Sequence, residues 1–304
     1  LARMNGLSAA ASRNYYQAAT EYVASAANEG NFYVTAQAKM IMAVNALGYA
    51  PDAMGQIDLL GQFLAYDFNQ GYKDPAVCTA ILNVLASKTY TPQNYTAADV
   101  LSYLLTYQNS DGGFHSAYSD ASDIDTTGDI LFTLADYQGY AGVPQAIENG
   151  LAYLAQQQNS DGGFGKAWGT DEPSSNANST GRVIYGLSAL QIDIVGDELF
   201  NQNGRNMLAY LLSLQNEDGG FAWQSGDSDG AATIDAVQAL SAYVRMVEGQ
   251  EGLYDLTNVG ISAEALQMQI EHAQSLVTKD YTVSSYALLQ KALEEARSCT
   301  EPVR

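Results

Sequence analysis

The heptapeptide QNSDGGF occurs at residues 108–114 and again at 158–164, and the close variant QNEDGGF occurs at 215–221. Weaker versions of the same turn, NEGNF at 28–32 and NQGY at 69–72, precede them. Each copy follows a stretch in which apolar residues recur three and four positions apart, which is the spacing of one helix face. A turn phrase repeated in this way indicates an array of similar helical units.

One predicted helix lies before each turn and a second helix lies after it. The first helices are predicted at 12–26, 56–68, 96–108, 143–158 and 199–215, and the second helices at 35–48, 75–87, 125–137, 178–191 and 231–247. The second helices are richer in small and apolar residues, which favours a double layer with the second helices inside. We therefore predict an all-α fold in which five to six helical hairpins close into an α/α toroid. An open solenoid is the alternative, but it needs polar capping repeats at both ends.

The turn phrase has a structural explanation in this scheme. Its paired glycines tolerate positive φ, its aromatic residue packs back between units, and Gln and Asn bond free backbone groups at helix ends. A Ca²⁺ role for Asp111, Asp161 and Asp218 is the alternative. One acid per turn is a poor cage for a cation that takes six or more oxygens. We therefore expect no metal site and no cofactor.

Composition and charge restrict the partners. The 304-residue chain has 34 acidic and 13 basic residues, which gives a formal net charge of −21. This charge argues against nucleic acid and anionic membranes as partners, and no apolar run approaches the roughly 20 residues of a membrane span. The two cysteines, Cys78 and Cys299, do not form a disulfide framework. The chain begins LARMNGLS, so we expect it to be a monomeric domain of a longer, multidomain precursor.

The phrase Q-N-x-D-G-G-F, followed by a helix that opens with D-x-D-x-T or S-T, resembles the prenyltransferase and squalene-cyclase repeat. Similar stretches include NQGYKDPAVCTAILNVLAS, STGRVIYGLSALQID and GAATIDAVQALSAYVR, and they are closest to the bacterial surface-protein branch of that family. The resemblance covers roughly residues 10–248 and implies an α/α toroid. It says little about function, because this fold hosts lipid cyclases, zinc prenyltransferases, cobalamin carriers, polysaccharide lyases and thioester domains.

A second resemblance covers the end of the chain. Residues 262–298 are similar to a FIVAR module, a small helical spacer of Gram-positive surface proteins, although only two of its usual three helices are present. We predict a toroid at 1–248, a linker at 249–261 and a partial module at 262–304. The alternative is that this last segment is the hairpin that closes the toroid.

Two activities of toroid proteins lack their sequence requirements here. Zinc-dependent prenyl transfer needs a carboxylate, a thiolate and a histidine that converge on one metal, but His115, His272, Cys78 and Cys299 do not stand at ligand spacing. A thioester domain needs a Cys-Gly-Glu-Gln-type sequence, whereas Cys78 lies in VCTA.

Class II terpene cyclases protonate an alkene with an aspartate of a D-x-D-D motif. The stretch DIDTT aligns with that motif and places Asp123 and Asp125 at the start of a second helix, but Thr126 replaces the last aspartate. The other interpretation is helix capping. The residues that we align in other repeats, 178–180 and 231–233, are consistent with capping.

Polysaccharide lyase action needs a base and a positive group that neutralises a uronate. His115 is the candidate base, with Lys166 and Arg182 as the nearest cations. An acidic protein is a poor host for a polyanion.

The loops between each GGF and the next second helix carry aromatic residues beside acids. In a toroid these loops gather on one face, where rings and acids can bind sugars or a partner protein. The alternative is that the rings cover the top of the core. The DSDG stretch at 227–230 resembles the start of an EF-hand but lacks its closing acids. The predicted binding residues are Tyr118, Trp168, Trp223, Asp120, Asp171, Glu172, Asp227 and Asp229.

These observations lead to one functional hypothesis and its alternatives. We predict a non-catalytic binding module of a secreted or wall-attached Gram-positive-type protein, with a glycan or a surface protein as ligand. The first alternative is an enzyme, either a cyclase that uses Asp123 and Asp125 or a lyase that uses His115. The second is a cobalamin carrier, which would need a further domain.

Overall fold

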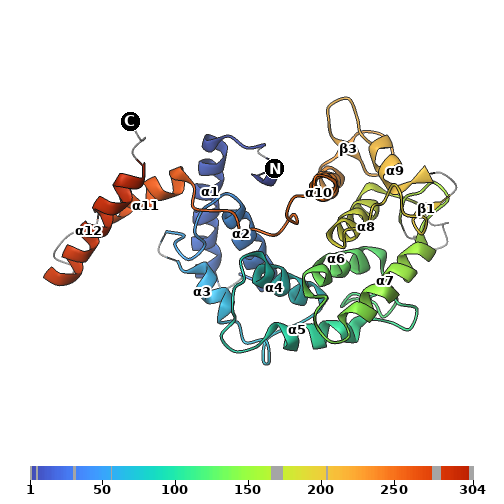
Figure 1. Cartoon of the computed structure of the whole chain (residues 1–304), viewed down its shortest axis with the longest axis horizontal. Coiled ribbons are helices and arrows are strands. Elements are labelled where there is room, and N and C mark those ends of the chain that lie inside the picture. The colour runs from blue at the N-terminus through green and yellow to red at the C-terminus, as the bar shows by residue number, and fades with distance from the viewer. Residues whose placement is uncertain are drawn as a thin grey trace. The chain divides into compact units, whose positions relative to one another are not determined.

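Figure 1 shows the computed structural model of the chain. It describes residues 2–4, 6–29, 32–55, 57–165, 174–202, 205–275 and 282–300. Their contacts define two compact units, one made of Leu1–Phe63 with Leu256–Arg304 and the other of Leu64–Asp255. The predicted boundaries at residues 248 and 262 remain a prediction. Within the described residues, no helix is long and apolar enough to span a membrane.

Helices make up most of the described chain, which confirms the all-α prediction. The α-helices are α1 (Ala9–Glu29), α2 (Val34–Ala46), α3 (Leu59–Leu64), α4 (Pro75–Ser87), α5 (Ala97–Leu104), α6 (Ile124–Leu134), α7 (Val143–Gln157), α8 (Ala177–Ala189), α9 (Met207–Ser213), α10 (Gly230–Val247), α11 (Ala263–Ser275) and α12 (Val283–Thr300). The 3-10 turns are η1 (Ala2–Met4), η2 (Leu105–Tyr107) and η3 (Ala135–Tyr137). The strands β1 (Asn201–Gln202) and β2 (Arg205–Asn206) pair antiparallel, as do β3 (Phe221–Ala222) and β4 (Ser228–Asp229).

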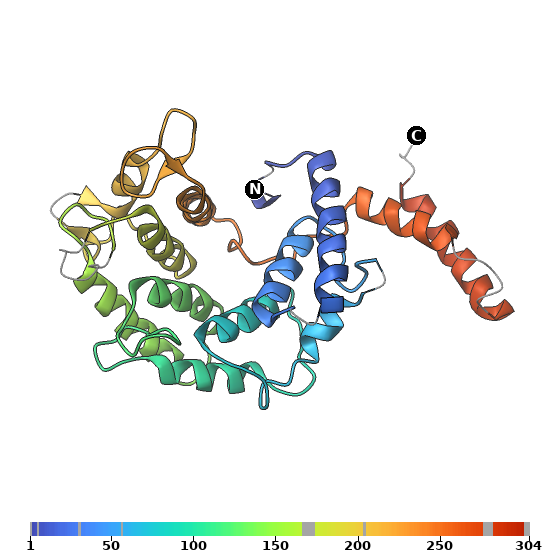
Figure 2. The ribbon, with the colours of Figure 1, turned by 180° about the vertical axis from the view of Figure 1, so that it is seen from behind.

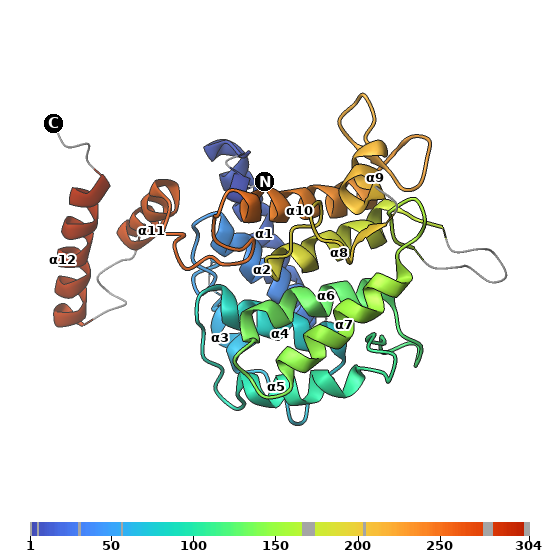
Figure 3. The same ribbon diagram turned by 45° about the vertical axis from the view of Figure 1, so that its right-hand side comes forward.

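The first unit contains α1, α2, the start of α3, α11 and α12. The rings of Tyr16 and Tyr49 stack at a centroid distance of 4.2 Å, and the Tyr16 hydroxyl donates to the carbonyl of Ala53 at 2.8 Å. The backbone N–H of Ser262 donates to the carbonyl of Gly48 at 2.8 Å, so the start of α11 is tied to the end of α2. Helices α11 and α12 pack against each other (Figure 3).

The second unit has two layers of helices. Helix α8 lies between α6 and α10, and α6 also contacts α4 (Figure 3). Helices α5, α7 and α9 pack on α4, α6 and α8 respectively, and the views in Figures 1 and 2 show them outside these partners. The apolar second helices thus form the inner layer, as a toroid requires.

Each inner helix of the second unit begins at a side-chain cap. The caps Asp74, Asp123, Asn176 and Asp229 each accept the backbone N–H three residues ahead at 2.8 to 2.9 Å. These bonds satisfy an N–H group that has no partner within the helix. Because each of these four helices has its cap at the same position, residues at the same distance from the cap are equivalent in α4, α6, α8 and α10.

The turn phrase joins the two layers. In its first full copy, Asp111 Oδ1 accepts the N–H of Gly113 at 3.0 Å and the Ser122 hydroxyl at 2.7 Å. Gly112 has a φ of +90°, which an L side chain rarely adopts. Phe114 is fully buried, and its N–H donates to the Thr127 hydroxyl of the next inner helix at 2.9 Å. The second and third copies repeat these contacts, so the phrase acts as a structural corner.

Two predicted first helices are shorter in the structure. The helix predicted at 199–215 covers only Met207–Ser213, because Asn206 caps it by accepting the Ala209 N–H at 2.8 Å. Before this cap, Asn201 and Gln202 pair with Arg205 and Asn206 as a short antiparallel ladder, which is not helical. The helix predicted at 56–68 covers Leu59–Leu64.

Candidate functional site

The acids of the DIDTT stretch lie at the start of α6. Asp123 is the N-cap, and its Oδ1 accepts both the backbone N–H of Thr126 at 2.8 Å and the Thr126 hydroxyl at 2.9 Å. Thr126, which stands in place of the last aspartate of D-x-D-D, therefore completes the cap. Asp125 is half-buried in the first turn, and its charge raises the pKa of Asp129.

The equivalent caps of the next two inner helices differ from the prediction. We aligned 178–180 and 231–233 with the capping stretch, whereas the side chains that cap are Asn176 and Asp229. Both residues have extended backbone, which aims the side chain at the N–H three residues ahead. The capping residues thus lie two positions before the stretches that we aligned, and the same register aligns Asp123 with Asn176 and Asp229.

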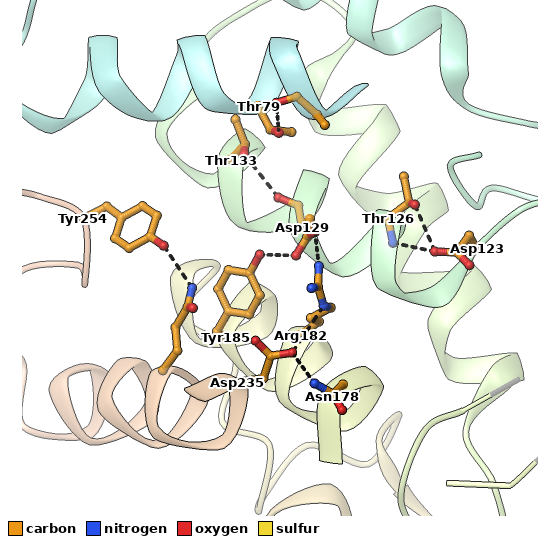
Figure 4. A network of polar contacts seen from close by, with 12 residues as sticks. Thr79, Asp123, Thr126, Asp129, Thr133, Asn178, Arg182, Tyr185, Asp235 and Tyr254 are labelled. Atoms are coloured by element: carbon orange, nitrogen blue, oxygen red, sulfur yellow. Dashed lines mark hydrogen bonds and ion pairs between the residues drawn. The ribbon is translucent and has the colours of Figure 1, made fainter. Parts of the chain in front are cut away.

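In this register, three successive inner helices carry a charged residue six positions after the cap. These residues are Asp129, Arg182 and Asp235, which we call the charged ladder. Arg182 Nη1 donates to Asp129 Oδ2 at 2.5 Å, and Arg182 Nε lies 3.7 Å from Asp235 Oδ2 (Figure 4). Tyr185 donates its hydroxyl to the other carboxylate oxygen of Asp129, and Asn178 donates to Asp235 at 2.7 Å.

Glycines bring the backbones of the ladder helices together. A Cβ on Gly128 would lie 2.8 Å from the carbonyl oxygen of Arg182, and one on Gly181 would lie 3.0 Å from that of Asp235. Each glycine stands directly before a ladder residue in the sequence. The close approach of α6, α8 and α10 therefore places the three ladder side chains within reach of one another.

The charged ladder contains more negative than positive charge. Burial raises the pKa of Asp129 to about 6, Arg182 lowers it, and Asp125 and Asp235 raise it further. Burial opposes the charge of Arg182, but the surrounding carboxylates outweigh burial and raise its pKa. The side chains of Asp129 and Arg182 nevertheless keep 33% and 35% of their exposure. Water therefore still reaches both side chains of this ion pair.

Aromatic rings lie beside the ladder. The Phe132 ring lies 4.6 Å from that of Tyr185 and 4.8 Å from that of Tyr254. Gln238 donates to the Tyr254 hydroxyl at 3.0 Å. Burial raises the pKa of Tyr254 to about 12, so its phenol stays neutral at physiological pH. This arrangement can hold a proton on Asp129 near pH 6 or a positive group beside the acids.

A sequence profile of the prenyltransferase alpha-alpha toroid domain matches residues 37–187 and 76–278. The chain belongs to this family. The two matches together span most of the chain and agree with the layers of inner and outer helices. No curated protein sequence matches the toroid chain.

The described residues of the predicted binding loops lie before the N-terminal ends of α6 and α10. Tyr118 is 92% exposed and Trp223 is 41% exposed. Asp120 and Asp227 are exposed, whereas Asp229 caps α10 by accepting the N–H of Ala232. The predicted residues outside the described part of the toroid are Lys166, Trp168, Asp171 and Glu172.

His115 lies in the same loop as Tyr118. Its ring lies 4.8 Å from the Tyr107 ring, and its Nδ1 is 2.9 Å from the carbonyl oxygen of Ser116. No three His, Cys, Asp or Glu side chains among the described residues are arranged to hold a metal ion. The carboxylates of Asp111, Asp161 and Asp218 all accept bonds from glycine N–H groups and serine hydroxyls of the turns.

Sequence reasoning missed Asp129, Tyr185 and Asp235, and it considered Arg182 only as a lyase cation. The signal that could have found them is their equal distance, in residues, from the helix caps. When Asp123, Asn176 and Asp229 are aligned, the ladder appears as charged residues at the same depth of otherwise apolar helices. A charge at such a position needs a partner, and each ladder residue finds it on the neighbouring helix.

Proposed function

We propose that the chain is a non-catalytic binding module that acts at the surface of a Gram-positive-type bacterium on a glycan or a surface protein. The observation that carries the proposal is the exposure of aromatic rings on the loops of the toroid. Tyr118 and Trp223 leave 92% and 41% of their surface in water, and the exposed acids Asp120 and Asp227 lie in the same loops. Loops held by a rigid scaffold are common binding surfaces, and exposed apolar groups often mark interaction sites.

The hydrogen bonds that Asp123 and Asp129 already accept support a non-catalytic role. The carboxylate of Asp123 accepts bonds from Thr126 as a helix cap. Both oxygens of Asp129 accept hydrogen bonds, one from Tyr185 and one from Arg182.

The location at the cell surface rests on resemblance and charge. Residues 262–298 resemble a FIVAR spacer, and the toroid repeats resemble those of bacterial surface proteins. We propose that the chain is extracellular or attached to the cell wall, with residues 262–304 as a helical spacer. The alternative that this segment closes the toroid stays open.

Binding of the fluorescently labelled full chain to purified Gram-positive cell walls, whole cells and a glycan panel tests this function. We expect saturable binding that Trp223→Ala or Tyr118→Ala weakens at least tenfold. The variant Tyr140→Ala, which removes a 41% exposed ring of the second unit beyond the C-terminal end of α6, should bind like the wild type. Absence of saturable binding to walls, cells and glycans would contradict the proposal.

A toroid-fold enzyme is the second candidate, and one observation favours it. Asp129 has a pKa of about 6 and lies among Tyr185, Phe132 and Tyr254, a combination typical of acid–base sites. Turnover of a neutral polysaccharide or isoprenoid that disappears in Asp129→Asn, with folding and wall binding intact, would favour this alternative. Loss of turnover in Asp123→Asn instead would point to the predicted cyclase motif.

A further inference from the structure

Tyrosines dominate the exposed surface around the start of α4. Between residues 64 and 124, all of which are described, the exposed large hydrophobic side chains are Tyr72 and Tyr118, at 67% and 92%. The Tyr103 hydroxyl donates to the carbonyl of Lys73 at 3.4 Å, so the residue after Tyr72 contacts the helix that precedes the Tyr118 loop. The hydrogen bond to Asp74 raises the pKa of Tyr72, and Tyr118 and Tyr103 raise it further. No large aliphatic side chain of this stretch is exposed.

Hydrogen bonds hold both the backbone and the side-chain hydroxyl of Tyr72 in place. Its carbonyl oxygen accepts a hydrogen bond from the Tyr66 hydroxyl, and its own hydroxyl donates to Asp74 Oδ2 at 3.0 Å. The other oxygen of Asp74 accepts the N–H of Val77 as the cap of α4. A ring fixed before a ligand arrives loses less conformational entropy on binding.

A chain of contacts leads from Tyr72 toward the Tyr118 loop. Lys73, the next residue, lies over the Tyr103 ring at 5.1 Å and donates to the Phe68 carbonyl at 3.2 Å. The hydroxyls of Tyr103 and Tyr107 are 3.2 Å apart, and the Tyr107 ring packs on His115 at 4.8 Å. We call Tyr72, Tyr103, Tyr107, His115 and Tyr118 the tyrosine platform.

The loop that carries Tyr118 is anchored by the turn phrase. Asn109 donates to the Asp120 carbonyl at 2.9 Å and to the Ser122 hydroxyl at 3.0 Å. His115 and Ser122 form an antiparallel bridge at the base of the loop. The backbone on both sides of Tyr118 is therefore fixed, while its ring projects into solvent.

We propose that the tyrosine platform binds a neutral glycan, with a sugar ring stacked on Tyr118 and its hydroxyls bonded by the polar groups around Tyr72. This inference rests on the proposed binding function and names the ligand class and the site. One face of a pyranose presents C–H groups that pack on an aromatic ring, and its edge presents hydroxyls. Tyrosine suits both parts because it offers a flat apolar ring and a polar end at small entropic cost.

The charge and composition of the platform select among ligands. The protein has a net charge of −21, and Asp74 and Asp120 lie at the platform, so a uronate or sulfate polymer is repelled. The Lys73 ammonium lies over the rings of Phe68 and Tyr103 and donates to the carbonyl of Phe68. The exposed large aliphatic side chains described in the second unit lie elsewhere, as on α10 at Ile234, Val244 and Val247. A neutral sugar fits this surface better than an apolar peptide.

Titration calorimetry of the full chain with neutral oligosaccharides of glucose, mannose, galactose and N-acetylglucosamine tests the inference, with oligogalacturonate for comparison. We expect at least one neutral series to bind, with at least tenfold loss in both Tyr118→Ala and Tyr72→Ala. Tyr118→Phe should stay within threefold of the wild type, because the ring remains. Tyr140→Ala, which removes a 41% exposed ring beyond the C-terminal end of α6, is the matched control and should not change binding. Circular dichroism of each variant checks that folding is intact.

Several results would overturn the inference while the proposed function stands. These are neutral-glycan binding that only Trp223→Ala abolishes, preferential binding of oligogalacturonate, and saturable wall binding without affinity for any neutral oligosaccharide. A protein ligand released by Tyr118→Ala, with no glycan bound, would also overturn it. Failure of every wall, cell and glycan assay would instead remove the proposed function together with this inference.

Discussion

At the residue scale, position within the helix decides what each aspartate of α6 does. Asp123 stands before the first turn, where its oxygen accepts the Thr126 N–H and hydroxyl. Asp129 stands in the second turn of α6, where burial and neighbouring acids outweigh Arg182 and raise its pKa to about 6. An aspartate therefore caps the helix at position 123 and carries a titratable charge at position 129.

Asp123→Ala should destabilise the protein by about 1 kcal/mol, because the Thr126 N–H loses its cap. Asp123→Asn should stay within a few tenths of a kcal/mol, since the amide oxygen can accept the same bond. Urea denaturation of both variants measures the difference. Equal stability of Asp123→Ala and the wild type would contradict the capping role.

Because of Asp129, the free energy of unfolding should fall as the pH rises from about 4 to about 6. Its folded pKa, about 6, lies above the ordinary value of 3.8, so the folded state binds this proton more tightly than the unfolded chain. The associated stability is present below pH 4 and is lost by the time the pH passes 6. Because the Asp129 side chain is partly exposed, we expect its contribution to the free energy of unfolding to be roughly 1 kcal/mol.

The variant Asp129→Asn isolates this effect. It keeps an oxygen for the Tyr185 hydroxyl but does not titrate. Urea unfolding of both proteins from pH 4 to pH 7 should show the wild type losing stability relative to the variant across that range. Parallel pH profiles would exclude the assignment. Asp136, whose pKa is also raised to about 6 by burial and Asp255, contributes equally to both.

At the element scale, glycines allow the backbones of neighbouring inner helices to approach each other closely. Gly128 faces the backbone of Arg182 on α8, and the carbonyl of Gly128 lies 2.7 Å from where a Cβ on Gly186 would be. Glycine is a poor helix former, so its presence in α6 and α8 has a packing reason. The close approach also sets the spacing of the charged ladder.

Gly128→Ala should destabilise the protein by about 1–3 kcal/mol, because the new methyl would lie 2.8 Å from a backbone oxygen that cannot move alone. Gly139→Ala is the matched control, since nothing lies within 4 Å of a Cβ built there. We expect the control to lie within about 0.5 kcal/mol of the wild type. Thermal unfolding of both variants provides the measurement, and equal effects would argue against close helix packing.

At the scale of the whole molecule, the net charge of −21 opposes compactness. Like charges repel through solvent, and salt screens them by shortening the Debye length from about 10 Å at 0.1 M to about 3 Å at 1 M. The melting temperature should therefore rise by several degrees between 10 mM and 0.5 M NaCl at pH 7.5. Near pH 4, where carboxylates become protonated, the same salt increase should have a smaller effect.

The repeated turn allowed the helices of the second unit to be predicted well. Helix α4 was predicted at 75–87 and has those bounds, and α7 and α10 deviate by one residue at one end. The errors fell at 199–215 and 56–68, where Asn206 and Asp58 each accept an N–H three residues ahead and so begin the helix later than predicted. Such competition depends on a few bonds that hydrophobic periodicity does not report.

The sequence by itself determined the family, the helical hairpins and the structural role of QN(S/E)DGGF, because periodicity and turn chemistry are local properties. Only the tertiary structure decided which side chains meet. Asp129, Arg182 and Asp235 are more than 50 residues apart in succession, and they join because glycines bring three inner helices together. The loops of Tyr72 and Tyr118 are likewise linked by contacts from Lys73 through Tyr103 and Tyr107 to His115. Contacts between distant residues follow from packing, which a local pattern does not specify.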